Sequence, residues 1–124
     1  MKRLLFLLIF ISETAYSANW IRVTNSNTGN VVFVDSLSMQ RSGNSVTFWA
    51  KMNKGKRDSV GDLSSKTQAI INCMTREVKY LYLMTYDDLD NQGKLTYSDK
   101  FKDQSWEPIA PETVYDAVRR FVCK

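Results

Sequence analysis

The stretch Ser45–Met52, which reads SVTFWAKM, decides the class of fold. Its alternate residues fall into an apolar set and a mixed set: Val46, Phe48 and Ala50 against Thr47, Trp49 and Lys51. Successive side chains of a β-strand point to opposite faces, so a period of two predicts a strand with one face toward a core. The stretch therefore predicts a β-sheet that buries at least one of its faces.

Similar stretches lie on both sides of this segment. The further predicted strands are Trp20–Thr24, Val31–Asp35, Lys66–Met74, Glu77–Tyr86 and Lys94–Ser98. Between them lie runs of turn-forming or polar residues: Asn25–Asn30, Arg41–Asn44, Asn53–Ser65, the pair Thr75 and Arg76, and Asp87–Gly93. Short strands joined by short loops favour an antiparallel meander, here of about six strands, over βαβ units.

The pattern changes after Trp106. Pro111 suits the first turn of a helix, where no backbone donor is needed. The apolar residues then recur at helical spacing, at Val114, Ala117, Val118 and Phe121. The sequence therefore predicts one amphipathic helix that ends at Cys123, and the fold class is α+β.

The N-terminus resembles a secretory signal peptide. Lys2 and Arg3 precede the apolar run Leu4–Ile11, which is too short to span a bilayer. Small residues favour cleavage between Ser17 and Ala18. We predict a signal peptide over residues 1–17, a single domain over residues 18–124 and export to the periplasm or outer surface. A buried helix or an uncleaved anchor is the alternative.

Two cysteines and no histidine follow the predicted cleavage site. In an oxidising compartment they predict a Cys73–Cys123 disulfide, because zinc needs about four ligands and a catalytic thiol needs a base. Closing this loop contributes about 4 kcal/mol in the chain-entropy model. Since Cys73 shares a strand face with Ala69 and Ile71, this face should point toward the helix.

The acidic loop partly fits a calcium-loop template. Its candidate ligand positions are Asp88, Asp90, Gln92, Gly93 and Asp99. Position 12 normally carries glutamate, and hairpin turn chemistry explains the same residues. No metal, no cofactor and no enzymatic activity is predicted, since the chain lacks histidine and a phosphate-cradling glycine loop.

A cluster of cations is the candidate partner-binding site: Lys51, Lys54, Lys56 and Arg57. It is either a solvated loop or a contact for an acidic partner, such as a sulfated glycan or an acidic protein segment. The net charge is +4, and +3 after residues 1–17 are removed. This mild, mixed charge does not indicate nucleic acid.

The segment Glu77–Tyr86 has apolar residues at both odd and even positions, and so on both faces of the predicted strand. Alternation places Tyr80, Tyr82 and Tyr86 on one face of the strand, and Leu81 and Leu83 on the other. We expect this strand to be central. The tyrosines are then core residues or a homodimer contact.

Several motifs together resemble the surface-adhesin E family. They are Trp20, Val32–Asp35 with Ser38 and Met39, Val46–Lys51, Asn72-Cys73 with Arg76, Tyr86–Gly93, Trp106–Ile109 and Val122-Cys123. The resemblance implies an antiparallel sheet with a disulfide-tied C-terminal helix. It also implies a possible dimer that binds host extracellular proteins such as vitronectin, laminin or plasminogen. A periplasmic structural or envelope protein without a host ligand is the alternative function.

Overall fold

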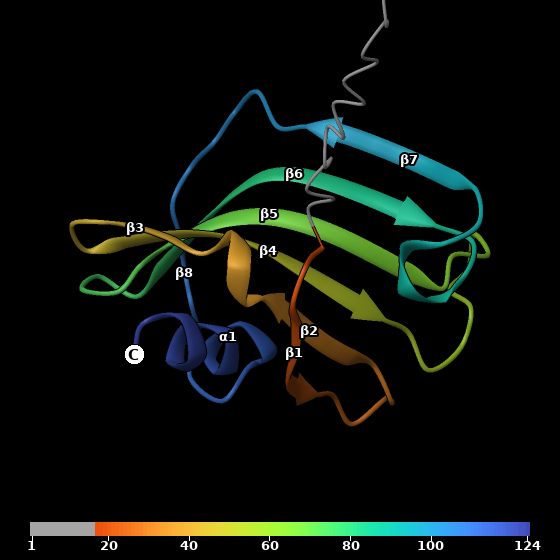
Figure 1. Cartoon of the computed structure of the whole chain (residues 1–124), viewed down its shortest axis with the longest axis horizontal. Helices are drawn as coiled ribbons and strands as arrows, with labels where there is room; N and C mark the ends of the chain where they lie inside the picture. Colours follow the sequence, from red (N-terminus) through yellow and green to blue (C-terminus); the bar gives the residue numbers. More distant parts are fainter. Residues whose placement is uncertain (1–16) are drawn as a thin grey trace, which may run out of the picture.

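The computed structural model describes residues 17–124, so the predicted signal peptide lies almost wholly outside the described residues. The main strands are β1 (Trp20–Asn25), β2 (Val31–Asp35), β4 (Ser45–Asn53), β5 (Ser64–Asn72), β6 (Glu77–Tyr86) and β7 (Leu95–Lys100). They form one antiparallel sheet in the order β1-β2-β4-β5-β6-β7 (Figure 1). The predicted α+β class and the antiparallel meander are confirmed.

Two short strands were not predicted. Strand β3 (Gln40–Ser42) pairs with the first residues of β4 through the turn at Gly43 and Asn44, while β2 pairs with the last residues of β4. Strand β8 (Glu107–Pro108) pairs with the start of β6. They bring the sheet to eight strands, and each is too short to produce a detectable alternation.

Strand β5 begins and ends two residues earlier than predicted. Ser64 and Ser65 pair with β6, so they belong to the sheet and not to the preceding loop. Cys73 follows the strand, and its N–H donates to the Asn44 carbonyl at 2.7 Å. Polar serines can occupy a strand here because pairing satisfies their backbone groups.

The helix α1 (Val114–Val122) begins later than predicted. Pro111 lies before it, because Glu112 has a φ of 63° that a right-handed helix does not allow. Thr113 is the N-cap, and its hydroxyl accepts from the Asp116 N–H at 3.2 Å. The cap therefore defines the start of the helix.

The core lies between the sheet and α1. Val34, Phe48, Ala69 and Ile71 are fully buried there, and α1 contributes buried Val118 and Val122. Figure 1 shows the helix beside β1, β2 and β8, and α1 contacts β1. No helix in the described range 17–124 is long and apolar enough to cross a membrane.

The Cys73–Cys123 disulfide is present. It joins the residue after β5 to the C-cap of α1, with the two Cα atoms 5.7 Å apart. The predicted link between the sheet and the helix is confirmed. The bond fixes the last turn of α1 over the face that carries Ala69 and Ile71.

A β-bulge in β6 overturns the predicted arrangement of tyrosines. Tyr80 pairs with Ala69 and Tyr82 pairs with Gln68, which leaves Leu81 without a partner in β5. One extra residue reverses the alternation beyond it. Tyr80 therefore packs edge-on against Tyr115 of α1, whereas Tyr82 lies on the opposite face of the sheet.

Candidate binding surface

The face of the sheet opposite α1 carries lysines and aromatic side chains from most of the strands. Side chains alternate along β4, so the residues between the buried Val46, Phe48 and Ala50, among them Trp49, lie on this other face, as does Lys51. We call this surface the lysine–aromatic face. Its members are Trp20, Phe33, Trp49, Lys51, Lys66, Lys79, Tyr82 and Lys100.

Lys51 is held in place by its neighbours on this face. Its side chain is only 9% exposed, and its Nζ lies 4.8 Å from the ring centres of both Trp20 and Phe33. The Nζ also donates to Asp90 Oδ1 at 3.3 Å. A cation near a ring face gains about 0.5–2 kcal/mol, more when desolvated. Lys51 is therefore a fixed, nearly buried cation and not part of the exposed loop.

The carboxylate partner of Lys51 belongs to the acidic loop. Asp90 Oδ1 also accepts from Asn53 Nδ2 at 2.7 Å. The hydrogen bond from Asn53, followed by that from Lys51, holds the pKa of Asp90 below its usual range. The Asp90 carboxylate is thus charged and fastens the acidic loop to β4.

Lys66 lies directly opposite Lys51 across the β4–β5 pair. Its Nζ is 4.9 Å from the ring centre of Trp49 and 6.0 Å from that of Trp20. Like charges directly opposite each other destabilise a sheet. No ion pair among residues 17–124 involves Lys66. The aromatic rings are the groups that accommodate this second cation.

Toward β6 and β7, this face again carries lysines that lie over aromatic rings. Trp49, Gln68 and Tyr82 lie in register on three adjacent strands, and the Trp49 and Tyr82 rings stack with centres 6.0 Å apart. Lys100 of β7 lies over Tyr82 at 5.7 Å, and Lys79 lies over Trp106 at 4.5 Å. Four lysines of this face are therefore each fixed over at least one aromatic ring.

The predicted basic cluster does not come together as one site. Lys51 lies on the sheet, as described above, and Lys54 donates to Asp58 within the loop. Arg57 donates to the carbonyls of Gly61 at 2.9 Å and Asp87 at 2.7 Å. Lys56 is exposed. Two of the three loop cations therefore hold the loop in shape.

The acidic loop is also explained by its own architecture. Asp88 Oδ1 accepts from the Leu89 N–H that opens the single turn η2 (Leu89–Asn91), and Asp87 Oδ1 accepts from the Lys94 N–H. Asp99 lies on β7 and accepts from the Tyr97 hydroxyl. Within the part of the chain that the structure describes, no group of three or more His, Cys, Asp or Glu could hold a metal ion.

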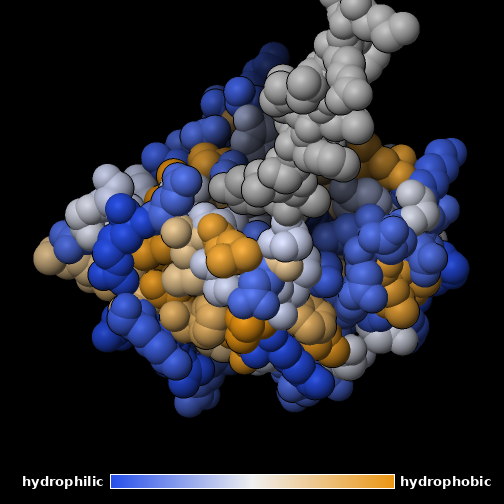
Figure 2. All heavy atoms as spheres, viewed as in Figure 1, coloured by the Kyte–Doolittle hydropathy of each residue, from blue (hydrophilic) through white to orange (hydrophobic). Residues whose placement is uncertain are grey.

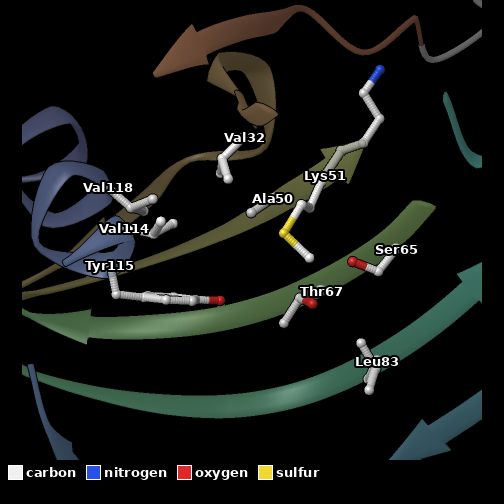
Figure 3. A pocket seen from close by; sticks show the side chains of 10 residues that line it. Val32, Ala50, Lys51, Ser65, Thr67, Leu83, Val114, Tyr115 and Val118 are labelled. Atoms are coloured by element: carbon white, nitrogen blue, oxygen red, sulfur yellow. The ribbon is translucent and has the colours of Figure 1, made fainter. Parts of the chain in front are cut away.

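An apolar cavity of about 200 Å³ lies on the other face, between α1 and the sheet. Figure 3 shows Val114, Tyr115 and Val118 approaching it from α1, whereas the amino end of Lys51 is directed away from it. Burial is the main cause that raises the pKa of the Tyr115 hydroxyl, followed by the neighbouring Tyr80. Tyr115 is therefore a neutral core residue at the edge of this cavity.

The comparisons with known proteins agree with this fold. The model of the family described as surface-adhesin protein E matches residues 20–124. This chain belongs to the surface-adhesin E family. A search of curated protein sequences finds no match.

Solved structures of Haemophilus influenzae protein E share the fold. Crystal form II of that protein aligns with a TM-score of 0.63 at 21% identity, over 89% of this chain and 91% of that one. A structure of protein E from non-typeable Haemophilus influenzae aligns with a TM-score of 0.58 at 18% identity, over 89% and 78% of the two chains. The resemblance to the family that the sequence predicted is confirmed.

Sequence reasoning missed most of the lysine–aromatic face. It placed Trp49 and Lys51 on the face opposite the core but assigned Lys51 to the loop, and it gave no role to Lys66 or Lys100. The alternation of side chains along each strand was the signal that could have placed these lysines on the face opposite the core. Their assembly also required the register between strands, which brings Lys51 and Lys66 to the same point.

Proposed function

We propose that this protein is an exported, adhesin-like binding protein whose lysine–aromatic face takes acidic segments of host matrix or serum proteins. Vitronectin, laminin and plasminogen represent the class of partner. Membership of the surface-adhesin E family supports the general role. The single observation that carries the proposed site is the set of four lysines fixed over aromatic rings on one sheet face.

Fixed cations are better suited to binding than flexible ones. Ordering a free lysine side chain on binding costs up to about 2 kcal/mol of entropy. On this face the aromatic rings already restrict the lysines, so part of that cost is met during folding. Aromatic residues are also enriched at the energetically dominant positions of protein interfaces. The loop cations Lys54 and Arg57, in contrast, are already engaged, Lys54 by Asp58 and Arg57 by the carbonyls of Gly61 and Asp87.

Binding to immobilised vitronectin and laminin tests this proposal. The face variant Lys66→Gln/Lys100→Gln should weaken binding by about tenfold or more, as the loss of two charge-assisted contacts implies. The loop variant Lys54→Gln/Lys56→Gln/Arg57→Gln removes one more charge and should bind nearly as the wild type. Rising salt should weaken wild-type binding. If only the loop variant loses binding, the contact lies in the loop and the face assignment is wrong.

The cellular location separates this role from the alternative. An adhesin must be reachable from outside, so protease added to intact cells should degrade the protein. If degradation requires a permeabilised outer membrane, the protein is a periplasmic envelope component and the adhesin proposal fails. The homodimer stays a prediction that sedimentation of the purified protein can test.

A further inference from the structure

A pocket of about 350 Å³ opens on the lysine–aromatic face beside the single turn η1 (Ser36–Ser38). It is lined by residues of η1, β3, β4 and β5, together with Ala18 and Asp35. We call it the Trp49 pocket. The side chains that give it its character are Gln40, Thr47, Trp49, Lys66 and Gln68. In the view of Figure 2, apolar residues gather near the centre of a largely hydrophilic surface.

The polar groups of this pocket are of two kinds. Ser38 and Asp35 are used by the fold: the Ser38 hydroxyl accepts from the Trp49 N–H, and Asp35 Oδ1 accepts from the N–H groups of Asn19 and Leu37. The second kind comprises the side chains of Gln40, Thr47, Lys66 and Gln68. Among residues 17–124, none of the hydrogen bonds or ion pairs of the structure involves them. Four side chains that can donate or accept hydrogen bonds thus line one cavity, and only Lys66 among them is held by another contact, its position over the Trp49 ring.

The pocket also has an apolar wall. The half-buried indole of Trp49 borders it, stacked against Tyr82 and with the Lys66 Nζ 4.9 Å from its ring centre. An aromatic π face is electron-rich, so it attracts C–H groups that neighbouring oxygens polarise. Amide and hydroxyl side chains on the remaining walls can both donate and accept hydrogen bonds. Such a combination suits a molecule that has C–H faces and several hydroxyl groups.

From these features we infer that the Trp49 pocket binds one acidic sugar unit, a monosaccharide that carries a carboxylate or a sulfate. The C–H face of the sugar packs on Trp49, and its hydroxyl groups bond to Gln40, Thr47 and Gln68. Lys66 pairs with the acid group, since a charge-assisted hydrogen bond is roughly twice as strong as a neutral one. The inference deepens the proposed function, because it names a chemical group that the same face recognises.

The size and charge of the pocket favour this occupant. A volume of about 350 Å³ lies at the lower end of the range for small-molecule sites, and it is too small for a folded protein segment. Its walls are too polar for a lipid tail. The Asp35 carboxylate, which also lines the pocket, is 7% exposed and is engaged by the N–H groups of Asn19 and Leu37, so Lys66 is the charged group left to meet a ligand. Cleavage before Ala18, which also lines the pocket, would add the positive α-ammonium group.

The test uses the protein purified from the exported fraction of the cell. It is titrated with glucuronic acid, with glucosamine 6-sulfate and with neutral N-acetylglucosamine, while NMR follows the indole signal of Trp49. Both acidic sugars, or one of them, should shift this signal saturably and bind at least about tenfold more tightly than the neutral sugar, as one charge-assisted contact implies. The tighter acidic sugar identifies whether a carboxylate or a sulfate is preferred.

Two variants make the result specific. Lys66→Gln should remove the preference for the acidic sugars and leave weak binding of the neutral one. Lys94→Gln removes the same charge from the exposed end of the acidic loop and should change nothing. The inference is overturned if no sugar shifts the Trp49 signal, or if the neutral sugar binds as well as the acidic ones. If the wild-type protein binds an acidic sugar but neither vitronectin nor laminin, the proposed partner is refuted and the assignment of the pocket remains.

Discussion

Removal of the Cys73–Cys123 disulfide should lower the stability of the fold by a few kcal/mol. The variant Cys73→Ala/Cys123→Ala removes both thiols, so no free thiol remains to form other disulfides. The bond spans 50 residues. For a loop of that length the chain-entropy model gives a loss of about 4 kcal/mol at 25 °C. Small domains are stable by about 5–15 kcal/mol in total, so this is a large fraction.

Urea unfolding measures this loss. With a slope near 2 kcal/mol/M, a loss of about 4 kcal/mol lowers the midpoint by about 2 M. The helix should remain formed without denaturant, because its own residues Val118 and Val122 are each only 1% exposed and hold it on the sheet. Its circular dichroism signal is therefore expected to be close to that of the wild type.

The control is the wild-type chain reduced with dithiothreitol, which should unfold at the same urea concentration as the double variant. A midpoint change that corresponds to less than about 1 kcal/mol would refute the loop-closure reasoning. The detection of two free thiols in the protein as exported from the cell would refute the bond itself.

Three further predictions concern the core, the helix cap and acid. Phe48→Ala should cost about 3–5 kcal/mol in urea unfolding, because the ring is fully buried; Phe48→Leu is the milder control, and equal losses would contradict this reading. Thr113→Ala should cost about 1 kcal/mol through loss of the N-cap, and Thr113→Ser should restore it. The hydrogen bond from Lys54 lowers the pKa of Asp58 to about 2. Because this folded-state pKa lies below the unfolded one, the stabilisation of the loop is complete above about pH 4 and is lost as the pH falls toward 2. Amide exchange of the loop at pH 5 and pH 2 checks this, and an Asp58→Asn variant that keeps the same pH dependence would contradict it.

The local patterns of the sequence were sufficient for the type of each long element. Alternation along Ser45–Met52 correctly separated the buried Phe48 from Trp49, because the pleat of a strand fixes opposite directions for neighbouring side chains. The helical spacing of Val114 and Val118 likewise identified α1. These signals depend on residues close together in the chain, so one sequence is enough to show them.

The bulge at Leu81 shows where such reasoning ends. Strict alternation placed Tyr80 and Tyr82 on one face, yet pairing with β5 inserts an extra residue between them and sends them to opposite faces. A bulge is decided by how two strands fit together, and no local pattern within Glu77–Tyr86 records it. The same applies to the start of α1, where the positive φ of Glu112 delays the helix beyond Pro111.

By itself, the sequence determined the α+β class, the strand faces and the pair of cysteines that joins the helix to the sheet. Only the tertiary structure decided which cations act together. Lys51 does not belong to the predicted loop cluster, because its Nζ lies against the rings of Trp20 and Phe33 and donates to Asp90. Lys66 belongs to the lysine–aromatic face together with Lys51, because the β4–β5 register places the two lysines opposite each other. Side-chain direction is a local property of the chain, whereas contact between distant residues depends on the packing of the whole sheet.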